Sequence, residues 1–234
     1  MKQSVRDGLS VSGILPGGIG LEKKAKYLQN QRHMDESPQT YENRTVCAYA
    51  YAVSEQNADN GVVVTAPTCG SSGVLPAVLV YMQDKKGFSE KDILQALATG
   101  GLIGNLIKHN ASISGAECGC QAEIGAACCM ASAALGELFH MDLDQIEYAA
   151  EVAMEHHLGL TCDPIKGLVQ IPCIERNAVA AMRAMNAVSL ANFLASSRKI
   201  SFDMVIATMY QTGLDMHNHY KETSEGGLAT AYRL

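Results

Sequence analysis

Most of this chain alternates between apolar and polar residues with the period of an α-helix, and Gly- and Pro-containing stretches separate the periodic segments. The predicted helices begin at short polar residues that can cap a helix N-terminus: Ser37 before Pro38, Ser89, Asp142 or Asp144, and Ser201. Residues 61–65 (GVVVT) have the composition of a strand, but the segment is too short and isolated to build a sheet. The pattern predicts an all-α fold, a single multi-helix globular domain of about eight helices.

Small residues are concentrated in some of the predicted helices. The paired glycines Gly100-Gly101 predict a close approach between two helices. A helix beginning at Cys120 or Gln121 is rich in Ala and Gly, so we expect it to be buried on most sides. Gly159 is expected to be the C-cap of the helix that begins near Asp142.

Four Gly-rich loops join the predicted helices, at residues 14–20, 66–73, 109–119 and 223–229. They contain more polar residues than packing requires, and loops on a rigid scaffold often carry functional sites. Two interpretations stay open for these residues, namely local turns and caps or a cradle for a small polar substrate. The residues concerned are Thr68, Ser71, Asn110, Ser112, Ser114 and Glu117.

Composition narrows the possible partners. The 234 residues are 47% hydrophobic, which is enough for one substantial core, and the formal net charge is −6. With no dense Lys/Arg face and no Trp, nucleic acid is not an expected partner. No run of apolar residues reaches the length of a membrane span, and the first residues lack the apolar stretch of a signal peptide.

Eight cysteines without a secretory signal suggest a reducing compartment, where thiols stay free or bind metal. Cys120 and Cys173 stand at predicted helix starts, whose partial positive charge stabilises thiolates, and Cys162 lies in a Pro-flanked loop. These three form a plausible site for a metal cluster. Their spacing matches neither a compact zinc motif nor a ferredoxin, so inert burial remains the alternative, as it is for Cys128-Cys129.

Three further residues lie next to these features. Arg176 and Asn177 follow Cys173 by one helical turn, so they either reach what Cys173 binds or cap and pair locally. His109 adjoins the 109–119 loop and is the histidine with a possible chemical role. The sequence contains no P-loop, no GxSxG elbow and no HExxH motif, and its Gly-rich pieces do not follow a strand as in a dinucleotide-binding fold.

Four long motifs resemble one known family in the same order along the chain: VVTAPTCGSSGVLPAVL (63–79), NASISGAECGCQAEIG (110–125), LTCDPIKGLVQIPCIERNA (160–178) and ETSEGGLA (222–229). They resemble the α, or catalytic, portion of the iron–sulfur-dependent bacterial L-serine dehydratases, which are L-serine ammonia-lyases. The resemblance covers nearly the whole chain.

The resemblance implies a [4Fe–4S] cluster held by Cys120, Cys162 and Cys173, with one iron left open for substrate. It implies conversion of L-serine to pyruvate and ammonia without pyridoxal phosphate, in the cytoplasm. The residues that we expect to hold serine are Thr68, Ser71, Asn110, Arg176 and Asn177. The base that removes the Cα proton is left open among His109, Glu117, Ser112 and Ser114.

The resemblance also implies partners, a β domain or subunit and further copies of the chain. Met1 corresponds to the interior of such a family member, so we expect the 234 residues to be a fragment lacking the β domain. Cys69 and Cys118 depart from the usual family pattern, and Cys118 competes with Cys120 as a ligand. The alternative function is a non-catalytic iron–sulfur module for sensing or redox.

Overall fold

The structure is a computed structural model that describes residues 1–31 and 34–232. The described residues form helices and no β-strand; isolated bridges pair Ile14 with Glu22 and Cys162 with Lys221. The α-helices are α1 (Lys2–Ser10), α2 (Ala25–Asn30), α3 (Pro38–Ala58), α4 (Val74–Lys86), α5 (Glu90–Asn110), α6 (Gly115–Cys118), α7 (Ala126–Leu138), α8 (Leu143–Glu155), α9 (Cys173–Leu194), α10 (Phe202–Asp215) and α11 (Leu228–Ala231). A π-helix, η1 (Gln121–Gly125), precedes α7, and short 3-10 turns are η2 (Ile165–Gly167), η3 (Ala195–Ser197) and η4 (Asn218–Tyr220). The predicted all-α fold is confirmed, including the absence of a strand at residues 61–65 among the described positions.

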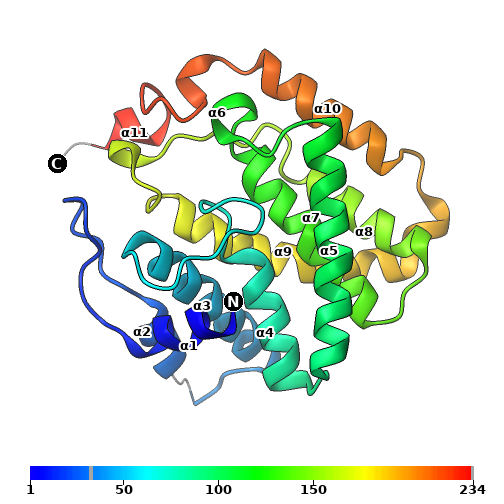
Figure 1. Cartoon of the computed structure of the whole chain (residues 1–234), viewed down its shortest axis with the longest axis horizontal. Coiled ribbons are helices and arrows are strands. Elements are labelled where there is room, and N and C mark those ends of the chain that lie inside the picture. The colour runs from blue at the N-terminus through cyan, green and yellow to red at the C-terminus, as the bar shows by residue number, and fades with distance from the viewer. Residues whose placement is uncertain (32–33, 233–234) are drawn as a thin grey trace.

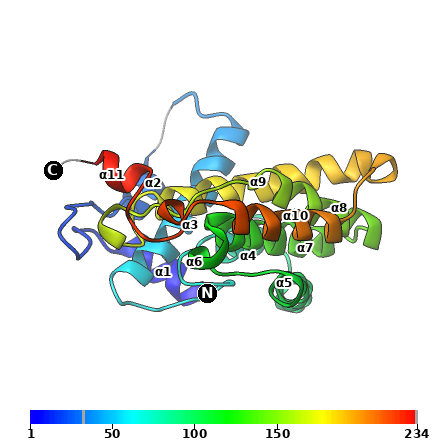
Figure 2. The ribbon, with the colours of Figure 1, turned by 90° about the horizontal axis from the view of Figure 1, so that it is seen from above.

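Helices α7 and α9 form the centre of the bundle. Helix α7 packs against α5, α8 and α9, while α9 also packs against α3, which carries α1, α2 and α4 on its other sides. Figure 1 shows α9 crossing the middle of the molecule. Seen from above, α5 stands end-on at the edge of the bundle (Figure 2). One end of α9, at Cys173, therefore lies among loops, and its remaining length lies among helices.

Small side chains allow the central helices to approach closely. Every residue of α7 is buried except Glu137, as its Ala-rich composition predicts. At Gly100 of α5, an added Cβ would lie 2.8 Å from the backbone oxygen of Met130 in α7, whereas at Gly101 it would meet nothing within 4 Å. Only the first of the paired glycines is thus required by helix packing.

The predicted helix starts are confirmed by their hydrogen bonds. Ser37 accepts from the Thr40 amide, and Ser201 accepts from the Met204 amide. The helices α5 and α8 begin with capping boxes at Ser89 and at Asp142. These caps are local, because each side chain accepts from the amide three residues further on.

The predicted C-cap at Gly159 is wrong. Helix α8 ends at Glu155 with His156 as its C-cap. Gly159 follows three residues later, in a turn where its φ of +81° suits glycine. The helical turn closes earlier because the His156 amide already bonds back to the Met154 and Val152 carbonyls.

The helical segment Cys173–Ser197 is long and apolar enough to cross a membrane by composition, with a mean hydropathy of 1.3 in its most apolar window. In this structure 44% of that window is buried inside the molecule, where α9 packs against α3, α7 and α8. A core helix passes the same composition test, so one such helix is weak evidence for a membrane span.

Candidate metal centre

The four Gly-rich loops meet around residues 160–172. The side-chain amide of Gln170 donates to the Pro16 carbonyl at 2.6 Å, which holds the 14–20 loop against this segment. The Ser224 hydroxyl donates to the Pro164 carbonyl at 2.9 Å, which ties down the 223–229 loop. Figure 1 and Figure 2 both show this segment beside α11.

Sulfur and oxygen donors come together where these loops meet. The Sγ atoms of Cys120 and Cys162 and a carboxylate oxygen of Glu123 all lie within 4.8 Å of one another. Cys120 immediately precedes the π-helix, and the backbone of Cys162 is held by hydrogen bonds to Tyr220 and Glu222 at 2.8 and 2.7 Å. Buried Cys173, the first residue of α9, lies outside this tight group but interacts electrostatically with Cys120. Of the three cysteines that the sequence singled out, Cys120 and Cys162 are therefore neighbours, and Cys173 lies further away at the start of α9.

The three thiols have different acidities. A hydrogen bond from the Cys162 thiol, together with the Arg176 guanidinium, lowers the pKa of Cys120 against the opposing effect of burial. The hydrogen bond to Cys120 and burial raise the pKa of Cys162. Burial and the charge of Cys120 raise the pKa of Cys173 to about 12. The protein thus makes Cys120 the most acidic of the three thiols, and a cation would stabilise the thiolate form of all three.

Arg176 links the thiols to a buried carboxylate. Its guanidinium donates to the Thr161 carbonyl at 2.6 Å and to Asp163 at 2.9 Å. It also forms a hydrogen bond with Cys120. Asp163 accepts from the Leu228 amide at 2.9 Å as well. Burial alone would raise the pKa of Asp163, but these donors together lower it. Arg176 therefore pairs with Asp163 and also lies beside Cys120, and its expected contact with serine stays a prediction.

Glu123 was missing from the residues singled out in the sequence. Its carboxylate accepts from the Thr68 hydroxyl at 2.7 Å and lies 4.0 Å from the Cys162 sulfur. Burial raises the pKa of Glu123, and the Thr68 hydroxyl opposes this rise. The available signal was its position three residues after Cys120, which places both on the same face of a helical turn.

The 66–73 loop is fixed to the start of α9. The Asn177 side-chain oxygen accepts from the Gly73 amide at 2.8 Å, and its nitrogen donates to the Gly70 carbonyl at 2.7 Å. Within the loop, the Thr68 and Ser71 hydroxyls are 3.0 Å apart. Asn177 therefore holds the loop that brings Thr68 to Glu123.

The 109–119 loop divides into an inner and an outer part. The Ser112 hydroxyl donates to Glu117 at 2.5 Å and accepts from the Ser114 amide at 3.1 Å. His109 and Asn110 are exposed at the end of α5, and no hydrogen bond joins either to the thiols among the described residues. The structure thus brings Ser112, Ser114 and Glu117 together and leaves His109 and Asn110 apart from them.

The other cysteines have separate surroundings. Cys118 is buried against α10, where an added Cβ at Gly213 would lie 2.6 Å from its sulfur. Cys128 and Cys129 are fully buried and donate to backbone carbonyls of α9 and α8, as expected of structural thiols. Cys69 is exposed and lines a small cavity of about 140 Å³ that also reaches Cys173.

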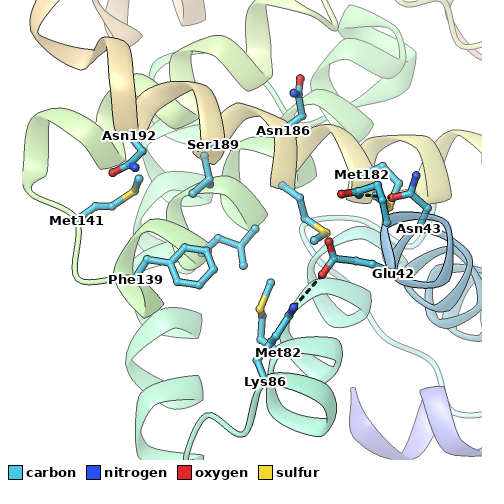
Figure 3. Close-up of a pocket in the computed structure, with 14 residues that line it drawn as sticks. Glu42, Asn43, Met82, Lys86, Phe139, Met141, Met182, Asn186, Ser189 and Asn192 are labelled. Carbon is cyan, nitrogen blue, oxygen red and sulfur yellow. Dashed lines mark hydrogen bonds and ion pairs between the residues drawn. The ribbon is translucent and has the colours of Figure 1, made fainter. Parts of the chain in front are cut away.

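A larger groove lies elsewhere on the molecule. It encloses about 840 Å³ between α3, α4, α7 and α9, and its wall includes the sulfur atoms of Met82, Met141, Met182 and Met185. Figure 3 labels Met82, Met141 and Met182 and shows the Lys86–Glu42 ion pair beside Met82. Its α9 residues begin at Met182, nine positions after Cys173, or roughly 13 Å along a helix. The groove is therefore separate from the thiol group.

The fold and this group of donors define the chain as an all-α protein with a candidate thiolate metal centre. Comparison with known families matches residues 1–229 to the serine dehydratase alpha chain. The chain belongs to this family.

Among its relatives, an L-serine dehydratase of Streptomyces coelicolor is 49% identical over 230 residues, covering 98% of this chain and 50% of the relative. L-serine dehydratase TdcG of Escherichia coli is 48% identical, with 98% of this chain and 51% of the relative covered. An L-serine dehydratase of Helicobacter pylori is 54% identical over 186 residues, which cover 79% of this chain and 41% of the relative. The chain spans about half the length of the curated relatives that it matches.

Proposed function

We propose that this chain is the catalytic part of an L-serine dehydratase, a lyase that converts L-serine to pyruvate and ammonia. The observation that carries the proposal is the approach of the Cys120 and Cys162 sulfur atoms to within 4.8 Å of each other, with Cys173 buried at the start of α9, in a family whose relatives bear this name. Soft thiolate donors at a protected site suit an iron–sulfur cluster. We infer that these three residues hold a [4Fe–4S] cluster.

The cluster, when bound, supplies a Lewis acid for the serine hydroxyl at the iron that has no cysteine ligand. Arg176 helps to lower the pKa of the Cys120 thiol and fixes the loop of Cys162 through Asp163. The hydroxyls of Thr68 and Ser71 offer hydrogen bonds to the polar groups of serine next to this position.

Elimination also requires removal of the Cα proton. Among the proposed bases, Ser112 and Glu117 are joined by a hydrogen bond in which the Ser112 hydroxyl donates to the Glu117 carboxylate at 2.5 Å. This bond would let Glu117 take the hydroxyl proton while Ser112 removes the Cα proton. Loss of the Cα proton and of the hydroxyl group of the substrate serine, together as water, leaves 2-aminoacrylate. This enamine tautomerises to an imine, and water then releases pyruvate and ammonia.

We further propose that a second domain or subunit completes the enzyme, because the relatives are about twice as long as the aligned region. Assembly into a homo-oligomer and a cytoplasmic location remain predictions of the family resemblance. The assay must therefore include the missing half, supplied as the corresponding part of a relative such as the Streptomyces coelicolor enzyme.

The test is anaerobic reconstitution with iron and sulfide, followed by ammonia release from L-serine. We expect the broad visible absorbance of a cluster and activity in the wild type, and loss of both in Cys162→Ser. Cys47→Ser is the matched control, since Cys47 lies in α3 outside the thiol group. Absence of the absorbance in the wild type would refute the cluster. A cluster whose spectrum is indifferent to L-serine would instead favour the non-catalytic module.

A further inference from the structure

We propose that Glu123 is a fourth donor of the metal centre, supplying a carboxylate oxygen to the iron that the three cysteines leave without a thiolate. This inference rests on the proposed function for the identity of the metal group. Its geometric basis is independent, because a Glu123 oxygen and the sulfur atoms of Cys120 and Cys162 all lie within 4.8 Å of one another.

The local backbone directs Glu123 toward the sulfur atoms. Glu123 is the central residue of the π-helix Gln121–Gly125, and single π-helical turns occur frequently at functional sites. Thr68, from the 66–73 loop, donates to Oε1 at 2.7 Å, which leaves Oε2 facing the Cys162 sulfur at 4.0 Å. One carboxylate oxygen is thus held by the protein and the other is presented to the thiols.

Two glycines from different loops leave room for this carboxylate. At Gly115, an added Cβ would lie 2.5 Å from Oε2 of Glu123 and 3.1 Å from the Cys162 sulfur. At Gly70, it would lie 3.2 Å from Oε1. A larger residue at position 115 would displace the carboxylate or the thiol, so the space between the loops is shaped around both donors.

The surroundings of the Glu123 carboxylate favour a cation beside it. Among residues 1–31 and 34–232, no lysine or arginine forms an ion pair with it, and its side-chain donors are a hydroxyl and a thiol. Arg176, the nearby guanidinium, is engaged with Asp163 and Cys120. A partly buried carboxylate with such donors is costly unless it takes up a proton or a cation neutralises it. A metal ion at the thiol group would do so.

The chemistry of the donors suggests what Glu123 does there. A carboxylate is a harder donor than a thiolate and is more readily exchanged at iron by another oxygen ligand, such as the hydroxyl of serine. We therefore assign Glu123 the task of retaining the fourth iron in the absence of substrate. Its removal should loosen one iron of the cluster and leave the other three held by cysteine.

Glu123→Gln tests the assignment, because the amide retains the shape of the side chain and can still accept from Thr68. The full chain, as wild type and as variant, is reconstituted anaerobically with iron enriched in the Mössbauer isotope. Mössbauer spectra are recorded, and iron release to a chelator is followed over time. We expect the variant to change the spectrum of one iron site and to release that iron at least about tenfold faster.

Two further variants sharpen the result. Glu137→Gln is the matched control, a partly buried glutamate further along the same run of helix whose carboxylate accepts from Thr99 at 3.1 Å. Thr68→Val removes the bond that orients Glu123 and should give an intermediate release rate, and it replaces Glu123→Gln if that variant does not fold. Circular dichroism of the metal-free proteins checks folding.

The outcomes separate this inference from the proposed function. If the wild type acquires the cluster but Glu123→Gln matches it in spectrum and in iron release, the assignment of Glu123 is overturned and the proposed function stands. If the wild type acquires no cluster, both are overturned. If Glu137→Gln releases iron as fast as Glu123→Gln, the effect is general destabilisation and the assignment is also overturned.

Discussion

The ion pair between Arg176 and Asp163 should contribute more to stability than the surface ion pairs of this chain. Its N–O distance is 2.9 Å, and the two side chains are 17% and 5% exposed. Asp163 also accepts from the Leu228 amide at 2.9 Å and from the Thr161 hydroxyl at 3.1 Å. The pair therefore joins the start of α9, the loop of Cys162 and α11.

The expected magnitude follows from this geometry. Removing one partner of a buried ion pair costs about 3–5 kcal/mol, because the other charge stays buried without its partner. After Arg176→Gln, Asp163 would keep its two other hydrogen-bond donors, which places the expected loss near the lower limit, at about 3 kcal/mol. The matched control is Arg198→Gln, since the acidic partners of Arg198, Glu147 and Asp144, are 38% and 78% exposed. Exposed pairs contribute about 1 kcal/mol or less.

The measurement is urea unfolding of the metal-free, reduced chain at neutral pH, followed by circular dichroism. Asp163→Asn and the double variant complete a cycle that isolates the coupling between the two side chains. If Arg176→Gln and Arg198→Gln lower the free energy of unfolding by amounts within about 0.5 kcal/mol of each other, the reasoning from burial is wrong.

The same pair predicts a dependence on acid. The pKa of Asp163 is lowered in the folded chain, so the unfolded chain takes up a proton first as the pH falls. The stabilisation is complete above the ordinary aspartate pKa of about 3.9 and is lost as the pH falls through the lower folded value. Stability of the Asp163→Asn variant should therefore decline less in this acidic range than that of the wild type.

Four other predictions concern single positions. Burial raises the pKa of Glu151 to about 7, so the folded chain binds an extra proton between the ordinary glutamate pKa of about 4.3 and this value. Stability should fall as the pH rises through this interval, and Glu151→Gln should flatten that slope in urea titrations at several pH values. Gly115→Ala should weaken iron retention at least about tenfold in iron analysis, because it displaces the Glu123 carboxylate or the Cys162 thiol. Gly101→Ala, in the middle of α5, should raise the free energy of unfolding in urea by about 0.5–1 kcal/mol. Ser89→Ala should cost about 1 kcal/mol in the same unfolding assay, because it breaks the capping box of α5.

The sequence predicts the long helices well because their boundaries depend on nearby residues. Each of the four caps needs only a short polar side chain and an amide three positions later, at Ser37, Ser89, Asp142 and Ser201. The helices α2, α6 and α11 contain six, four and four residues and are too short to show a hydrophobic period, so the expected number of helices was too small.

The centre itself was only partly predictable, because its geometry depends on contacts between distant segments. Thr68 reaches Glu123 across 55 positions, and Asn177 reaches Gly73 across 104. A glutamate between Ala and Ile in an apolar helix gives no local sign of such partners. The π-helix that turns it toward Cys162 also has no periodic signal in the sequence.

The cysteines show how tertiary structure separates residues that look equivalent in the sequence. Cys118 and Cys120 both stand at a loop-to-helix junction, and spacing does not distinguish them. In the folded chain the Cys118 sulfur packs against Gly213 of α10. Cys120 instead forms hydrogen bonds with the Cys162 thiol and the Arg176 guanidinium. The distinction depends on α10, which begins more than eighty residues later, at Phe202. A ligand assignment for this pair therefore requires knowledge of which helix covers each sulfur atom, and the contact with Arg176 favours Cys120 because a guanidinium stabilises the thiolate that a metal binds.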